Sequence, residues 1–140
     1  MESVGIIIIA KDTNRFFLLH RAKSPIVWSS LTGKMEEGED TMQTIKREIK
    51  EEIGVNPIMI DGIKEVGIAN KTHHVMVGYV DKEFKVPKLE TSENDDYGWF
   101  DEETLPSPMH KRWLESFELI KPLLKLREGF KYNLNKLLNG

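Results

Sequence analysis

Residues 33–55, GKMEEGEDTMQTIKREIKEEIGV, contain the pattern on which the fold depends. Apolar side chains recur there every three or four residues, at Met42, Ile45, Ile49 and Ile53. This spacing predicts a helix over residues 40–53 with one buried face. Asp40 or Thr41 can cap its start and Gly54 can end it, because these residue types are preferred at helix ends.

Three glutamates, Glu48, Glu51 and Glu52, share one face of the predicted helix because they lie three and four residues apart. Neighbouring carboxylates repel each other, so a multivalent cation bound to them would explain the cluster. Carboxylate oxygens suit Mg²⁺, which proteins often share with substrate phosphates. Taken alone, the spacing is more typical of a solvated charged face, to which Lys46 and Lys50 would add positive charge.

The glutamates belong to a longer pattern. Gly33 is followed by five residues and Glu39, and seven residues later REIKEEIGV occupies residues 47–55. This resembles the Nudix box, in which G, five residues, E and seven residues precede R-E-U-x-E-E-x-G-U, where U is a bulky aliphatic residue. All nine specified positions match. By this resemblance the chain is identified as a MutT-like member of the Nudix hydrolase family.

The resemblance implies an α/β fold, the Nudix α/β/α sandwich with a mixed β-sheet and a loop–helix–loop catalytic motif. It also implies that water attacks phosphorus, with Mg²⁺ or Mn²⁺ as the cofactor. Such ions bind phosphate oxygens and lower the pKa of water. Glu48, Glu51 and Glu52 would be the metal-binding or base-forming carboxylates, and the division between ligand and general base stays open.

Other residues in and before the box are expected to support the metal site. Arg47 and Glu39 match positions that usually pair and hold the loop to the helix, although a purely structural role is an equal alternative. Gly33 matches a position of close backbone approach. Many relatives have Pro-Gly-Gly where this chain has Leu31-Thr32-Gly33. The carbonyl of Thr32 is therefore a candidate metal ligand, provided that a β-branched residue fits there.

A further carboxylate is expected from a downstream loop, because some relatives supply one shortly before a strand that begins with tryptophan. Glu93 lies six residues before Trp99 in this chain and is the first candidate for that ligand or base. Asp95 and Asp96 are the reserve candidates. The alternative is an acidic loop that is simply solvated.

Candidates for substrate contact are less specific. Arg21 or Lys34 could contact phosphates, with a surface charge as the alternative. The aromatic candidates for stacking on a base are Trp28, Tyr79 and Trp99, for which core packing is the alternative. His73 and His74 alternate faces on a predicted strand, so at most one could face the site.

The rest of the chain predicts one domain over residues 1–140, with no repeat or linker. Strands are expected at residues 3–10 and 15–21, forming a hairpin, and at 58–69 and 73–80. Residues 22–38 and 81–98 are predicted to be loops, the second with a short extended piece. Tyr97 to Phe100 could form a last strand.

Two C-terminal helices are also expected. Ser107-Pro108 resembles a helix start, with serine as the cap and proline at the first helical position. An apolar stripe follows at Trp113, Leu114, Phe117, Ile120 and Leu124, which should pack on the sheet. Pro122 should kink or end this helix, and residues 127–140 could form another short one.

Composition narrows the possible partners. The net charge of −3 makes extended nucleic-acid binding unlikely, because proteins that bind nucleic acid usually carry a basic excess. The absence of cysteine excludes disulfides and thiolate sites. Residues 4–10 are too short to span a membrane and lack the flanks of a signal peptide, so a cytoplasmic location is expected. A homodimer is possible, since many small relatives dimerise.

The expected function is divalent-metal-dependent hydrolysis of a nucleoside diphosphate linked to another moiety. A free (deoxy)nucleoside triphosphate or related nucleotide ranks first. Patterns typical of ADP-ribose pyrophosphatases and diadenosine polyphosphate hydrolases are absent after the box, but dinucleoside polyphosphates, ADP-ribose and nucleotide sugars stay open. A hydrolase of RNA 5′ ends or caps and a non-catalytic nucleotide-binding Nudix domain are the remaining alternatives.

Overall fold

A run of four isoleucines forms the centre of the structure. In the computed structural model, which describes residues 2–124, Ile6 to Ile9 lie in β1 (Ser3–Ala10) and are all buried. β1 pairs in parallel with β6 (His73–Val80) along its whole length. Its other edge pairs antiparallel with β4 (Leu31–Lys34) and with β2 (Phe16–Arg21). A strand covered on both faces favours such a continuous β-branched run.

The sheet has seven strands and is mixed. Its main order is β3-β2-β1-β6-β5, while β4 pairs with β1 and β7 pairs with β2. The remaining strands are β3 (Trp28–Ser29), β5 (Asp61–Ala69) and β7 (Asn94–Phe100). Short 3₁₀ helices occupy η1 (Pro57–Met59) and η2 (Glu102–Thr104). The predicted hairpin of β1 and β2 is confirmed by the pair Ile9 and Phe16.

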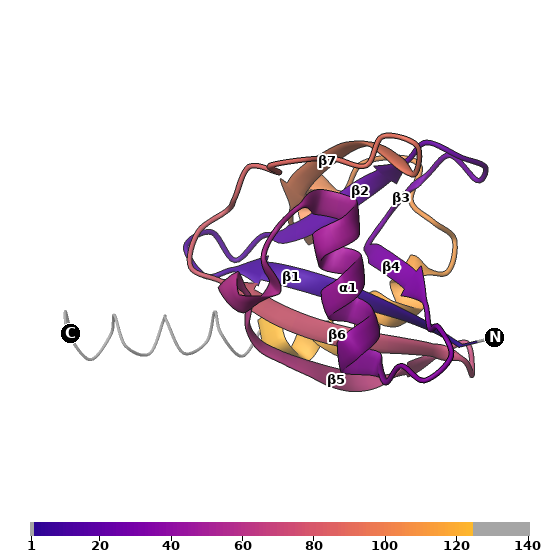
Figure 1. Ribbon diagram of the computed structural model, residues 1–140. Helices are drawn as coiled ribbons and strands as arrows, with labels where there is room; N and C mark the ends of the chain where they lie inside the picture. Colours follow the sequence, from indigo (N-terminus) through magenta and orange to yellow (C-terminus); the bar gives the residue numbers. More distant parts are fainter. Residues whose placement is uncertain (1, 125–140) are drawn as a thin grey trace, which may run out of the picture.

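Helices cover both faces of the sheet, which confirms the predicted α/β/α sandwich (Figure 1). α1 (Thr41–Ile53) packs Ile45, Ile49 and Ile53 onto one face. A helix that includes residues 113–124 packs onto the other face. Its buried side chains there are Trp113, Phe117 and Ile120.

Local signals fix both ends of α1. The Asp40 side chain accepts from the backbone N–H of Gln43, and the Gln43 side chain accepts from the backbone N–H of Asp40. This reciprocal capping box satisfies N–H groups that have no partner within the helix. Gly54 adopts a left-handed conformation with φ of 67° and donates its N–H to Lys50. The predicted helix and its glycine stop are confirmed.

Several predicted boundaries are wrong because tertiary pairing decides them. Residues 22–38 contain β3 and β4, whose short polar sequences form strands only by pairing with β2 and β1. β7 begins at Asn94 rather than near Tyr97, since its polar residues pair with β2. β5 begins at Asp61, after a 3₁₀ turn whose Ile58 is 79% exposed.

The helix predicted to start at Ser107-Pro108 starts later, at residue 113. The backbone around Pro108 pairs with β3 instead, because Trp28 donates its N–H to the Pro108 carbonyl and accepts from the His110 N–H. Leu114 is 59% exposed and so lies outside the buried stripe. The helix does not end at Pro122. The helix predicted over residues 127–140 lies outside the described residues.

An ion pair ties the loop after β1 to the segment after β6. Arg15 donates from Nε and Nη2 to the two oxygens of Glu83 at 2.7 and 2.6 Å, and the Thr13 hydroxyl donates at 2.6 Å. The Arg15 hydrogen bonds hold the pKa of Glu83 below its usual value. The ionised form of Glu83 is therefore more stable, relative to its protonated form, in the folded chain than in the unfolded chain.

We expect Glu83→Gln to lower the free energy of unfolding at pH 7 by less than about 1 kcal/mol, because the Arg15 side chain is 41% exposed. A carboxyl group whose pKa is lowered by folding stabilises the folded state at pH values above its unfolded pKa. This stabilisation is lost as the pH falls through its folded pKa. The difference from wild type should therefore shrink in acid. Urea unfolding at pH 7 and pH 3 measures it, with exposed Asp81→Asn as the control. A difference of equal size at both pH values would contradict the assignment.

Candidate active site

Glu48 and Glu52 form the less exposed part of the carboxylate cluster on α1. The Glu48 side chain is only 10% exposed, and its carboxyl group lies beside that of half-buried Glu52. Burial raises the pKa of Glu48, against the effect of the Arg47 guanidinium. Burial and the neighbouring carboxylates of Glu48 and Glu93 raise the pKa of Glu52 to about 7. Negative charge is thus concentrated here beyond what nearby cations balance.

Gly33 makes room for the Glu48 carboxyl group. A Cβ atom built at Gly33 would lie 2.2 Å from Cδ of Glu48, far inside van der Waals contact. β4 carries Gly33 past α1 because it pairs with β1, with Gly33 opposite Val4. The structure therefore agrees with the close approach predicted for this glycine.

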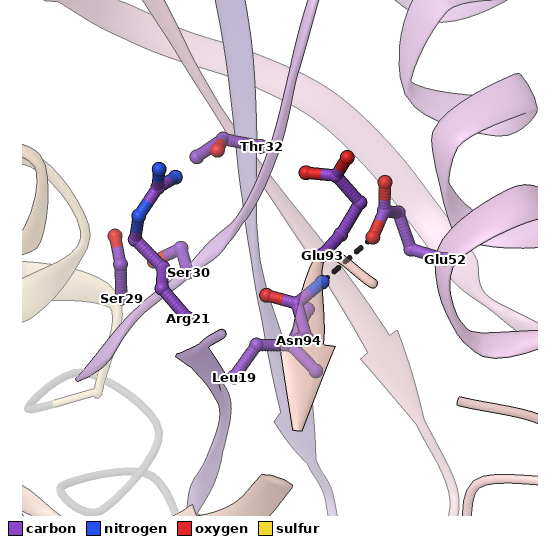
Figure 2. A pocket seen from close by; sticks show the side chains of 8 residues that line it. All are labelled: Leu19, Arg21, Ser29, Ser30, Thr32, Glu52, Glu93 and Asn94. Atoms are coloured by element: carbon purple, nitrogen blue, oxygen red, sulfur yellow. Dashed lines mark hydrogen bonds between the residues drawn. The ribbon is translucent and has the colours of Figure 1, made fainter. Parts of the chain in front are cut away.

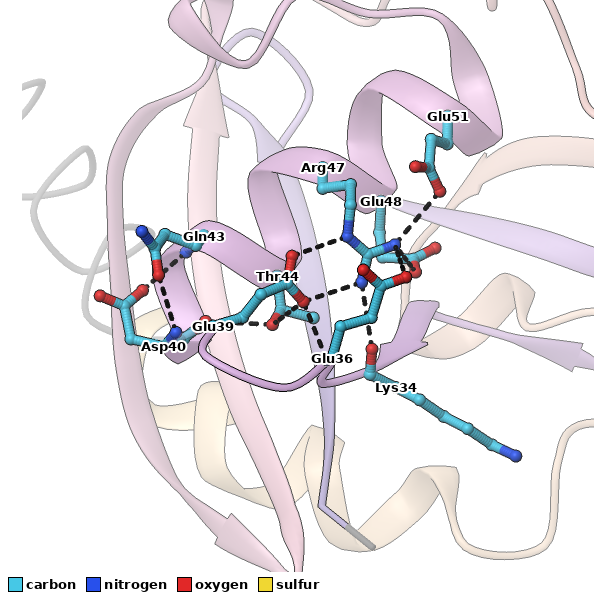
Figure 3. Close-up of polar contacts among 9 residues, drawn as sticks. All are labelled: Lys34, Glu36, Glu39, Asp40, Gln43, Thr44, Arg47, Glu48 and Glu51. Carbon is cyan, nitrogen blue, oxygen red and sulfur yellow. Dashed lines mark hydrogen bonds and ion pairs between the residues drawn. The ribbon is translucent and has the colours of Figure 1, made fainter.

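Arg47 connects the loop before α1 to the helix (Figure 3). Its guanidinium donates to both oxygens of Glu39 at 2.8 and 3.0 Å, and to Glu48 at 2.8 Å and Glu51 at 3.2 Å. It also donates to the backbone carbonyl of Lys34 at 3.1 Å. The hydrogen bonds from Arg47 lower the pKa of Glu39 to about 2. The predicted pairing of Arg47 with Glu39 is present in the structure.

A cleft opens beside Glu52, with a volume of about 360 Å³ that includes its open mouth. It is lined by Leu19, Arg21, Ser29, Ser30, Thr32, Glu52, Glu93 and Asn94. Figure 2 shows Arg21 facing Glu52 and Glu93 across it. Five of the predicted site residues thus share one region, because the Glu48 carboxyl group lies beside that of Glu52 at the wall of the cleft.

Arg21 reaches the cleft from the end of β2, and Glu93 reaches it from the residue before β7. The Arg21 guanidinium donates to the carbonyls of Pro25 at 3.1 Å and Ser24 at 3.4 Å, which orients it. Glu93 lies in the turn before β7 and pairs with Lys23 at 3.0 Å. Thr32 lies in β4 opposite Gly5, where extended backbone accommodates a β-branched residue.

Other predicted residues lie outside the cleft. Glu51 is 56% exposed and pairs with Arg47, and the Lys34 side chain is exposed. Tyr79 packs into the core cluster on the sheet face opposite α1. Trp28 packs against the rings of His20 and Phe100.

The remaining aromatic and histidine candidates have structural contacts. Trp99 packs against Phe17 and Phe84, so it belongs to the core, which was the alternative to stacking on a base. His73 is hydrogen-bonded to Ser3 at 2.7 Å. His74 pairs with Glu65 at 2.8 Å.

Sequence reasoning missed the uncharged residues of the cleft other than Thr32. Asn94 is buried and donates from Nδ2 to Oε2 of Glu52 at 2.6 Å. Ser30 accepts a hydrogen bond from the Trp113 indole at 2.8 Å, so the C-terminal helix helps to fix β3 and β4. The signal for Asn94 was its place among the acidic residues after Glu93, as the one amide in that run.

The donor set suits a hard divalent cation. Carboxylate oxygens of Glu48 and Glu52 lie together, and Glu93 borders the same cleft. Within residues 2–124 no three acidic or histidine side chains already surround an ion position. Magnesium sites commonly use one or two carboxylates and complete their coordination with water and substrate phosphates, so two converging carboxylates fit.

Comparisons with known proteins support the same interpretation. The sequence matches the family model of the NUDIX domain over residues 1–121. The dihydroneopterin triphosphate diphosphatase of Escherichia coli (strain K12) is 41% identical over 56 residues, 40% of this chain and 37% of that protein. The Haemophilus influenzae protein of the same name is 42% identical over 52 residues, 37% of this chain and 33% of that protein. The chain spans about a third of the length of these curated relatives.

Solved structures share the fold. The E. coli dihydroneopterin triphosphate pyrophosphohydrolase has a TM-score of 0.64 at 24% identity, covering 85% of this chain and 92% of that one. An Ap4A hydrolase from C. elegans has a TM-score of 0.60 at 20% identity, covering 96% and 99%. No helix within residues 2–124 is long and apolar enough to cross a membrane.

We expect Gly33→Ala to disturb the site more than the fold. Its Cβ would displace the Glu48 carboxyl group, which would lose its hydrogen bond from Arg47 and its place beside Glu52. Mn²⁺ binding, measured by electron paramagnetic resonance, should weaken by about 10-fold or more. Gly38→Ala is the control, since Gly38 has φ of 84° but open space around a Cβ. It should lower the melting temperature and leave Mn²⁺ binding intact. Equal Mn²⁺ affinity in both variants would contradict this role for Gly33.

Proposed function

Because the chain belongs to the NUDIX domain family, we propose that it is a divalent-metal-dependent pyrophosphohydrolase of a free nucleoside triphosphate or a related triphosphate. The observation that carries the proposal is the adjacent pair of carboxyl groups of buried Glu48 and half-buried Glu52, beside a cleft that Arg21 lines on its other side. The names of the bacterial relatives make dihydroneopterin triphosphate a specific candidate.

Glu48, Glu52 and Glu93 would hold Mg²⁺ or Mn²⁺, with the Thr32 carbonyl and Glu51 as further candidates. A bound divalent ion supplies charge neutralisation at phosphate oxygens and a lower pKa for attacking water. Arg21 carries its guanidinium on the opposite wall, where it can pair with phosphate oxygens. Glu39, Arg47 and Gly33 would keep the carboxylates in place.

The reaction is a substitution at phosphorus. Water adds one P–O bond, the anhydride P–O bond breaks, and the products are a nucleoside monophosphate and pyrophosphate. A carboxylate near the cleft accepts the proton released from water. Glu52 and Glu93 are the candidates for this base because both line the cleft.

We expect hydrolysis of the substrate only in the presence of the divalent metal ion. A panel should contain dNTPs and their oxidised forms, dihydroneopterin triphosphate, dinucleoside polyphosphates, ADP-ribose, nucleotide sugars and capped RNA. Each substrate is incubated with Mg²⁺, Mn²⁺ or EDTA, and the products are identified by mass. A triphosphate should give a monophosphate and pyrophosphate. Hydrolysis of only a compound that is not a triphosphate would assign the protein to that substrate class instead. Metal binding without hydrolysis of any compound would favour a non-catalytic nucleotide-binding domain.

Glu52→Gln should lower kcat by about 100-fold or more, since it removes a candidate ligand and base. The metal-free melting temperature should stay equal or rise, because the change removes repulsion with Glu48 and Glu93. The matched control is Glu37→Gln, an exposed glutamate of the loop before α1, which should behave like wild type. Near-normal turnover in folded Glu52→Gln would refute the site assignment.

A further inference from the structure

The segment of residues 88–94 caps the end of α1 that carries Glu52. Lys88 donates its backbone N–H to the carbonyl of Ile53 at 3.4 Å, and Glu90 donates to the carbonyl of Glu52 at 3.0 Å. The last carbonyls of a helix have no partner within the helix, so such donors fix its end. This segment therefore sets the position of the Glu52 backbone.

Asn94 ends this segment and begins β7. Its backbone N–H donates to the Glu90 carbonyl at 2.9 Å, and it pairs with Arg21 of β2. A bulge between His20 and Arg21 lies at the same point. Bulges of this kind redirect side chains and are frequent beside functional sites. The backbone of Asn94 is thus anchored to the sheet rather than to α1.

The Asn94 side chain reaches from the sheet to the helix (Figure 2). Nδ2 donates to Oε2 of Glu52 at 2.6 Å, and Asn94 is only 9% exposed. The Glu52 carboxyl group is therefore held between two contacts, the amide of Asn94 and the carboxyl group of Glu48. A half-buried side chain held by contacts on two sides has few alternative rotamers.

The chemistry of this donor is informative. Arg47 donates to Glu39, Glu48 and Glu51 with a full positive charge. The donor at Glu52 is an amide, which orients the carboxylate without neutralising it. An uncharged donor leaves the attraction between Glu52 and a cation largely intact.

We propose that Asn94 is a positioning residue that fixes Glu52 for a divalent ion. The inference rests on the proposed function, since it assumes that Glu52 is a metal ligand. Hydrogen-bond partners that orient metal ligands typically contribute 10–100-fold to metal affinity or activity. Asn94 acts through Glu52, and it couples the ligand on α1 to the loop that carries Glu93.

The test measures Mn²⁺ binding to metal-free protein by electron paramagnetic resonance, without substrate. Asn94→Ala removes the donor and leaves space, whereas Asn94→Leu removes the donor and keeps a similar side-chain shape. Both variants should bind Mn²⁺ about 10–100-fold more weakly than wild type. In steady-state kinetics both should need more metal for half-maximal activation, with little change in the substrate KM at saturating metal.

Ser92→Ala is the matched control, because the Ser92 hydroxyl donates to Glu90 within the same exposed turn at 2.8 Å. It should bind Mn²⁺ like wild type. Normal affinity in Asn94→Leu would overturn the proposal, since any loss in Asn94→Ala alone would then come from packing. Failure of both Asn94 variants to fold, checked by circular dichroism, would also overturn it. Wild-type protein that binds no Mn²⁺ would instead overturn the proposed function.

Discussion

The guanidinium of Arg47 is the interaction on which the local structure depends most. It donates to Lys34 at the end of β4, to Glu39 of the loop, and to Glu48 and Glu51 of α1, so one side chain joins the strand, the loop and the helix. Buried or partly buried carboxylates are costly without such partners. The absence of a side chain at Gly33 completes the constraint, because the Glu48 carboxyl group occupies that space. The loop and helix therefore cannot move independently without leaving charges unpaired.

Arg47 balances the negative charge of only some glutamates in the acidic cluster. Its contacts reach Glu39, Glu48 and Glu51, whereas Glu52 lies between Glu48 and the amide of Asn94 at the cleft. Burial, together with repulsion from Glu48 and Glu93, accordingly raises the pKa of Glu52 where the cluster meets the cleft. Charge pairing with Arg47 is thus concentrated at Glu39, Glu48 and Glu51, and the excess negative charge lies at Glu52. This separation lets the same short sequence hold itself together and attract a cation.

The sequence predicted the elements whose signals are local. The Asp40 cap, the isoleucine stripe and Gly54 all lie within or beside the helix that they define. β3 and β4 were missed because their strand character comes from pairing with β2 and β1. Ser107-Pro108 suggested a helix start, yet the backbone there pairs with Trp28, about 80 residues away in sequence. Local propensity could not reveal such partners.

The same distinction applies to the site. Glu48 and Glu52 were accessible to prediction because their spacing is fixed by the helix, whereas Asn94 depends on where β7 meets α1. The cleft accordingly has two kinds of wall. One is built on α1 and β4, whose register with β1 leaves little freedom for substitution at Gly33. The other comes from Arg21 at the end of β2 and from the exposed turn that carries Glu93, which is joined to the segment after β2 by its ion pair with Lys23. Loops tolerate substitution and insertion more readily than packed elements, so the discrimination between triphosphates should reside in this second wall.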